Sequence, residues 1–240
     1  SLNQNFDLSN KIEQIKENNF DYIKMDYNDT YGIGCDGAES LGEGLRKDRE
    51  ASLNFIRKLR REIPNLIIEN CASGGHKTEP LMMSLSSMAS SSDAHECENI
   101  PVIAAGLHRT ILPQQNQIWC VLRKQDTLQR IAYSIAAGFL GRLCFSGDVT
   151  KLTTLQWKKI DEGISFYKEI APIIKDGYSY LYEKRGPSAR KLEGYQGVFR
   201  TGKAGSYLTV HVFDNPPEKI EITLPEEYRK LKVIKREYKG

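Results

Sequence analysis

Apolar residues recur along most of the chain in two alternating patterns, one of helical spacing and one of short continuous runs. The helical patterns predict helices, which cover 8–18, 45–62, 99–111, 128–135 and 155–170. The short runs predict strands, which cover 22–25, 66–69, 87–92, 117–122 and 143–146. Because a helix, or a loop leading to one, follows every strand, we expect the strands to lie parallel.

Polar residues gather just after the predicted strands, as they do at the active rim of a (β/α)8 TIM barrel. Five strands are too few to close an eight-stranded barrel, and the chain opens with a helix that should follow a strand. Three explanations remain: a piece of a larger enzyme, a barrel completed by a partner chain, or an open α/β sheet. We favour the last five strands of a TIM-type barrel.

The pattern changes after about residue 186, where alternating and β-branched runs are separated by turn signals. These runs are GVFRT, SYLTVHVF, KIEITL and KVIKREY, and TGKAG and DNPP lie between them. They predict a small antiparallel β-domain. We therefore divide the chain into barrel residues 1–183 and a β-rich domain over 184–240.

Composition excludes several classes of protein. The 34 basic and 31 acidic residues leave a net charge of +3, too balanced to indicate a nucleic-acid or membrane-surface partner. No apolar run approaches the roughly 20 residues of a membrane span. The five cysteines are scattered, which argues against a disulfide framework or structural zinc and predicts a reducing, cytoplasmic location. No export signal is visible in the sequence.

The first candidate site is Lys24-Met25-Asp26-Tyr27-Asn28-Asp29, where the first strand opens into a loop. Lys24 and Asp26 are two residues apart in a strand, so both side chains point to the same side. They could face one sugar-sized ligand. The alternative is a strand end held by ordinary ion pairs.

The second candidate is the glycine-rich segment Cys71–Pro80, directly after the second strand. Small residues allow the backbone to approach a ligand closely. The segment lacks the spacing of a phosphate loop or of a dinucleotide fingerprint. The alternatives are a plain glycine-rich turn with Cys71 buried, or a Cys71 nucleophile for which the spacing justifies no histidine base.

The third candidate lies at the end of the third strand and holds four titratable residues, Asp93, His95, Glu96 and Glu98. Asp93 follows Asp26 by 67 residues, about two β/α units, so both carboxylates would share one barrel rim. Two facing carboxylates suit glycoside hydrolysis. The alternatives are capping of the next helix by Ser92 or Asp93, and a metal site, for which HExxH spacing is missing.

Together and in this order, the three motifs resemble the melibiase-type α-galactosidases of glycoside hydrolase family 36. YIKMDYN is similar to the family's K-W-D-x-N strand, ENCASGGHKTEP to its C-S-G-G-G-x-R-x-D-P loop, and SSSDAHE to its S-D-x-x-D-A segment. The resemblance covers about residues 20–155. Met25 stands in place of the family's Trp.

The resemblance implies that Asp26 is the nucleophile and Asp93 the general acid/base of a retaining hydrolase. It implies substrate-binding roles for Lys24, Asn28, Cys71, Gly74, Gly75, Lys77 and Glu79. Lys77 and Glu79 stand where the family has Arg and Asp, and a lysine offers a point charge in place of a bidentate fork. Trp119 and Trp157 lie in apolar patterns, which favours core positions for both over the alternative of sugar-stacking platforms.

The family implies an α-galactoside oligosaccharide or glycoconjugate as substrate, and neither a metal nor an organic cofactor. Three alternatives remain: an α-N-acetylgalactosaminidase, a carbohydrate-binding chain without catalysis, and another TIM-barrel or thiol hydrolase using Cys71. Because the family's earlier strands are missing, we expect a homo-oligomer or a site completed by an N-terminal segment.

Overall fold

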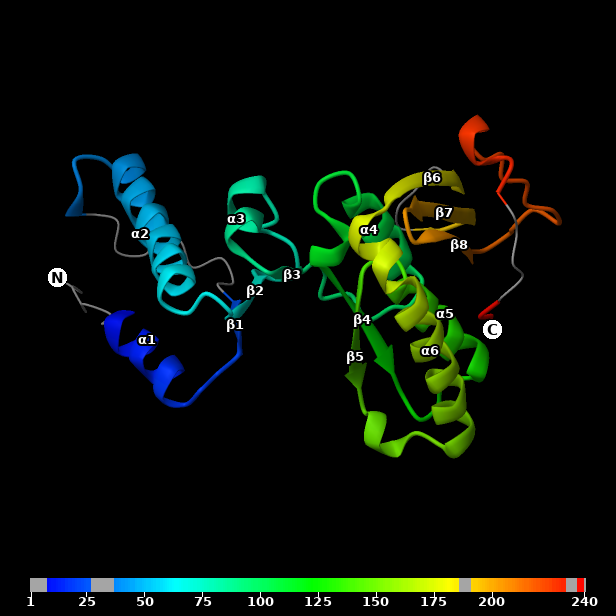
Figure 1. The fold of residues 1–240 in the computed structure, drawn as a ribbon, viewed down its shortest axis with the longest axis horizontal. Helices are drawn as coiled ribbons and strands as arrows, with labels where there is room; N and C mark the ends of the chain where they lie inside the picture. Colours follow the sequence, from blue (N-terminus) through cyan, green and yellow to red (C-terminus); the bar gives the residue numbers. More distant parts are fainter. Residues whose placement is uncertain (1–7, 27–36, 186–190, 232–236, 240) are drawn as a thin grey trace. The chain divides into compact units, whose positions relative to one another are not determined.

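The structure is a computed structural model that describes residues 8–26, 37–185, 191–231 and 237–239 (Figure 1). The chain divides into two compact units, one up to Ser91 and one from Ser92 onward. Five parallel strands alternate with helices along the chain, and a separate three-stranded antiparallel sheet follows them.

The first unit alternates three helices with three parallel strands. Its elements are α1 (Leu8–Glu17), β1 (Tyr22–Asp26), α2 (Leu41–Glu62), β2 (Ile67–Cys71), α3 (Pro80–Leu85) and β3 (Met88–Ser90). β1 pairs with β2 from Tyr22↔Ile67 to Asp26↔Cys71, and β2 pairs with β3. The carboxyl ends of these strands therefore lie at one edge of the sheet.

The core of the first unit lies between the helices and one face of its strands. Ile12 of α1 and Ile56 and Leu59 of α2 are buried there against Ile68 of β2, and Ile23 of β1 packs beside them. Because successive strand residues point to opposite faces, this packing turns the alternate residues of β1 and β2 away from the helices.

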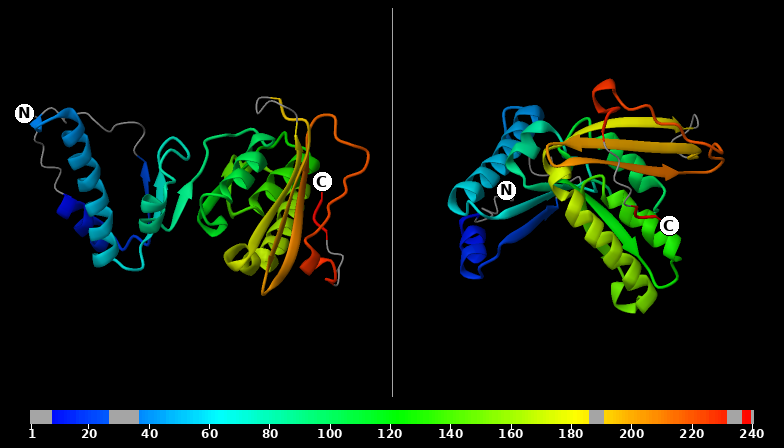
Figure 2. Two further views of the ribbon diagram at one scale, coloured as in Figure 1. Left: turned by 90° about the horizontal axis from the view of Figure 1, so that it is seen from above. Right: turned by 45° about the vertical axis from the view of Figure 1, so that its right-hand side comes forward.

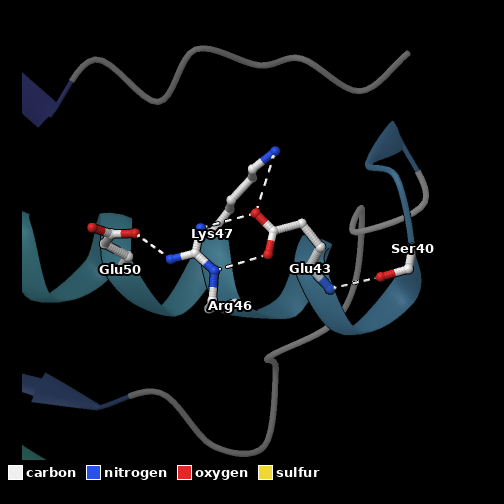
Figure 3. A network of polar contacts seen from close by, with 5 residues as sticks. All are labelled: Ser40, Glu43, Arg46, Lys47 and Glu50. Carbon is white, nitrogen blue, oxygen red and sulfur yellow. Dashed lines mark hydrogen bonds and ion pairs between the residues drawn. The ribbon is translucent and has the colours of Figure 1, made fainter.

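Helix α2 begins with a network of polar contacts on its exposed surface (Figure 3). The Ser40 hydroxyl accepts a hydrogen bond from the backbone N–H of Glu43, which satisfies a donor of the first turn. Arg46 donates to both Glu43 and Glu50, and Lys47 lies 3.5 Å from Glu43. Hydrogen bonding from Arg46 lowers the pKa of Glu43 to about 2. Ser40 is therefore the N-cap of α2, and the charged side chains pair along its first turns.

The second unit continues the alternation and adds the antiparallel sheet. Its helices are α4 (Asn99–Leu107), α5 (Leu128–Gly138) and α6 (Thr154–Asp176), with 3₁₀ turns at Pro113–Gln115, Val149–Lys151 and Glu226–Tyr228. Its strands are the parallel pair β4 (Asn116–Leu122) and β5 (Arg142–Gly147) and the antiparallel β6 (Tyr178–Arg185), β7 (Gly194–Gly202) and β8 (Gly205–Val212).

One face of the antiparallel sheet packs on the helices of its own unit (Figure 2). Arg200 of β7 is buried and donates to the carbonyl oxygens of Ile173 and Ile174 at the end of α6, at 3.0 and 2.6 Å. Gln196 of β7 donates to the carbonyl of Pro101 in α4 at 2.9 Å. These buried hydrogen bonds join β7 to α6 and α4, so the sheet and the helices stabilise each other.

The structure confirms the predicted fold class, with five parallel strands and the helices between them, and corrects the tail. β6 was not predicted, although its Tyr-Ser-Tyr-Leu-Tyr alternation is a strand signal. KIEITL was predicted as a strand and forms none. KVIKREY lies mostly outside the described residues. The boundary at 183/184 stays a prediction, and β6 begins before it.

Two buried histidines in the second unit predict a pH-dependent stability. Burial lowers the pKa of His108 and of His211 from 6.5 to about 4. The unfolded chain therefore binds more protons between pH 6.5 and 4, and stability falls as the pH drops through that window. We expect a loss of up to about 3 kcal/mol per histidine in urea unfolding. A profile that stays flat from pH 7 to 4 would contradict this.

Candidate active site

Lys24 and Asp26 lie on the face of β1 that points away from the helices. Ile23 and Met25 pack toward the core of the first unit, so the alternate residues Lys24 and Asp26 face the other side. Asp26 pairs in register with Cys71 at the carboxyl ends of β1 and β2. The predicted nucleophile and the predicted sugar-binding lysine thus share one face, which we call the inner face.

Glu69 of β2 also lies on the inner face, and the sequence analysis missed it. It pairs in register with Lys24, and its carboxylate lies 3.6 Å from the Lys24 ammonium. The Glu69 side chain is 2% exposed and the Lys24 side chain 35%. A buried carboxylate needs a facing cation, so Glu69 holds Lys24 in place. The available signal was the spacing: Glu69 precedes Cys71 by two residues, so both side chains point to the same face of the strand.

Cys71 is buried beside the carboxylate of Asp26. Burial raises the pKa of its thiol, and the neighbouring Asp26 adds to that effect. The thiolate is the reactive form of cysteine, so this environment disfavours Cys71 as a nucleophile. Cys71 is therefore better interpreted as a small buried side chain at the base of the site.

Backbone geometry explains the glycines of the loop after β2. Ser73, Gly74 and Gly75 adopt φ angles of 46°, 63° and 113° in succession, and the backbone N–H of His76 donates to the carbonyl of Ala72 at 3.1 Å. Left-handed conformations favour glycine. A Cβ atom on Gly75 would lie 2.6 Å from the carbonyl oxygen of Ser91.

Replacing Gly75 with alanine is expected to lower the free energy of unfolding by about 3 kcal/mol, because strain at positive φ adds to the clash with Ser91. Urea unfolding measures this. The matched control is Gly106→Ala in α4, where an added Cβ meets nothing within 4 Å and stability should hold or rise by up to about 1 kcal/mol. If the two substitutions changed the free energy of unfolding equally, the requirement for glycine at position 75 would be contradicted.

Lys77 and Glu79 have contacts within the first unit. The Asn70 side chain donates to the backbone carbonyl of Lys77, and the Lys77 Nζ atom is buried. The Glu79 carboxylate lies 2.7 Å from the Arg49 guanidinium of α2. Glu79 therefore connects the loop to α2, and substrate-binding roles for both residues stay predictions.

The segment around Asp93 begins the second unit and has irregular backbone. Ser92 accepts a hydrogen bond from the backbone N–H of Ala94 at 3.0 Å, and Glu96 accepts one from that of His95 at 3.2 Å. Helix α4 begins only at Asn99. Capping by Ser92 or Asp93 is therefore wrong as an interpretation, and Asp93 remains the candidate acid/base.

Trp119 and Trp157 are not core residues, which corrects the interpretation from the sequence. Trp157 is 40% exposed on α6. Trp119 is half-buried on β4, and its ring centroid lies 5.9 Å from that of His95.

Among the residues that the structure describes, no group of three His, Cys, Asp or Glu side chains could hold a metal ion. Asn28, the remaining predicted substrate-binding residue, lies outside the described residues. Of the helices that the structure describes, none is long and apolar enough to cross a membrane.

Alternating parallel strands and helices, with polar side chains at the strand ends and an antiparallel sheet after them, define a chain of the β/α-barrel class. The sequence matches the profile of the Melibiase family over residues 6–177, and the chain belongs to that family. A comparison with curated proteins gives no match.

Solved structures of α-galactosidases share the fold. The enzyme from Lactobacillus brevis is 20% identical with a TM-score of 0.67, and the match covers 82% of this chain and 27% of that one. AgaB, a GH36 enzyme from Geobacillus stearothermophilus, is 17% identical with a TM-score of 0.68, over 82% and 28%. A variant of AgaA from the same organism, in complex with raffinose, is 16% identical with a TM-score of 0.63, over 80% and 29%. The chain thus spans less than a third of the length of these proteins.

Proposed function

We propose that the chain carries the two catalytic carboxylates of a retaining glycoside hydrolase that removes terminal α-linked galactose. Asp26 is the nucleophile and Asp93 the general acid/base. The observation that carries the proposal is the family match over 6–177, with Asp26 on the inner face beside Lys24. The reaction is a double displacement.

In the first step the Asp26 carboxylate attacks the anomeric carbon while the bond to the leaving oxygen breaks and Asp93 gives that oxygen its proton. A galactosyl ester on Asp26 results. In the second step Asp93 takes a proton from water, and the water oxygen displaces Asp26 from the same carbon. Two inversions leave the product in the α configuration.

The predicted substrate-binding residues bind and orient the sugar in this proposal. Lys24 donates to a galactose hydroxyl from the same face of β1 as Asp26. Gly74 and Gly75 let the backbone approach the sugar, and Cys71 fills the base of the site. Asn28, Lys77 and Glu79 complete the proposed binding set.

The solved relatives indicate the type of substrate. Variants of AgaA were crystallised with raffinose and with stachyose, both α-galactosides of oligosaccharide size. We propose such oligosaccharides as substrates of this chain. The described cysteines, Cys71, Cys97, Cys120 and Cys144, are free thiols, which agrees with a reducing compartment.

Hydrolysis of an aryl α-galactoside beside the matching α-N-acetylgalactosaminide tests the proposal. We expect release of the aryl alcohol from the galactoside, with α-galactose as the first product seen by proton NMR. Faster hydrolysis of the N-acetylgalactosaminide would identify the chain as an α-N-acetylgalactosaminidase in place of an α-galactosidase. A β-configured first product, or no turnover of either sugar, would contradict the proposal.

A further inference from the structure

Trp119 is placed on the inner side of its strand by the residues on either side of it. Its neighbours Ile118 and Cys120 are buried in clusters formed with α4 and α5, namely against Ala104 and Ile131. Successive strand residues point to opposite faces, so the Trp119 ring points away from these helices. The ring is half-buried, so part of it is open to a ligand.

His95 brings a second ring to the same place. The two ring centroids lie 5.9 Å apart and the ring planes are inclined by 34°. His95 is exposed, and it follows Asp93 by two residues in the irregular segment before α4. Two partly exposed rings therefore lie beside the segment that holds the candidate acid/base, and all three residues belong to the second unit.

The position next to Asp93 determines which part of a substrate these rings could meet. A general acid contacts the glycosidic oxygen, which joins galactose to the leaving group. The apolar face of a pyranose ring packs against aromatic side chains, and a histidine adds a polar edge for its hydroxyls. Neither residue has a role in the family motifs described above.

We propose that Trp119 and His95 form a subsite for the sugar ring of the leaving group. This inference rests on the proposed function, because it takes Asp93 as the acid/base. It deepens that function by naming the leaving group as a sugar of an oligosaccharide. The chain should therefore favour α-galactosyl oligosaccharides over galactosides with a small alkyl leaving group.

The chain contains two tryptophans, which allows a direct binding test. In an Asp26→Asn, Trp157→Phe variant, Trp119 is the sole tryptophan and the substrate is not consumed. Raffinose is expected to change the Trp119 fluorescence, and methyl α-galactoside, which lacks the second sugar, is expected to leave it unchanged. The Asp26→Asn, Trp119→Phe variant, which keeps Trp157, is the matched control and should respond to neither.

Affinities measured by calorimetry complete the test. We expect Trp119→Ala to weaken raffinose binding about tenfold, with methyl α-galactoside changed less than about twofold. Trp119→Phe, which keeps a ring, and His95→Phe should retain most of the raffinose affinity, whereas His95→Ala should lose part of it. Thermal unfolding checks that each variant folds.

The subsite would be overturned if Trp119→Ala weakened the binding of raffinose and of methyl α-galactoside equally, or weakened neither. Binding of methyl α-galactoside by the parent chain would in that case still support the proposed function. Failure of the parent chain to bind either sugar would overturn the proposed function, and the subsite with it.

Discussion

Asp26→Ala is expected to lower α-galactoside hydrolysis by at least about a thousandfold, because no covalent intermediate can then form. Azide should restore turnover of an aryl α-galactoside by attacking from the face that Asp26 occupied. One inversion then yields β-galactosyl azide, which NMR identifies.

Asp93→Ala is the matched control, since it removes the other carboxylate of the same proposed pair. The nucleophile is intact, so the galactosyl ester forms when the leaving group is good, and azide then displaces Asp26. Two inversions yield α-galactosyl azide. The same azide product from both variants, or activity above a few per cent in Asp26→Ala, would contradict the assigned roles.

Lys24→Met is expected to destabilise the chain by about 3 kcal/mol, because it leaves the Glu69 carboxylate buried without the ammonium it faces. Glu69→Gln removes that buried charge and should change stability by about 1 kcal/mol or less. The double variant should recover most of the stability lost in Lys24→Met. Urea unfolding of the three variants measures these differences.

Among Lys24→Met, Glu69→Gln and the double variant, we expect turnover to change in a different order from the free energy of unfolding. In the double variant Lys24 is absent, so we expect sugar binding and turnover to stay as low as in Lys24→Met. In Glu69→Gln the ammonium is present but no longer held, so we expect turnover to fall with little loss of stability. Lys16→Met, which breaks an exposed pair with Glu62 at 2.8 Å, is the control and should cost less than about 1 kcal/mol. Recovery of activity in the double variant would contradict the role of Glu69.

The parallel strands and their helices were predictable because their residues carry local signals. The ends of the five predicted strands agree with those of β1 to β5 to within two residues, since apolar runs and turn signals specify them. In the tail, a strand forms only where a partner strand pairs with it. KIEITL has the composition of a strand but forms none, and its local sequence does not reveal this. β6 carries an alternating pattern that was overlooked, and its pairing with β7 is a contact that the pattern alone does not specify.

The sequence by itself determined the family and the candidate chemistry of this protein, because order and spacing of Lys24, Asp26, Cys71 and Asp93 are properties of the chain. Only the tertiary structure decided which side chains of neighbouring strands share a face and which side chains are buried. The register between β1 and β2 places the Glu69 carboxylate opposite the Lys24 ammonium. The tertiary structure also brings Glu79, in the loop after β2, into an ion pair with Arg49 of α2. Strand alternation on β4 turns Trp119 away from the core. Burial and long-range pairing arise from contacts between distant segments, so no local pattern contains them.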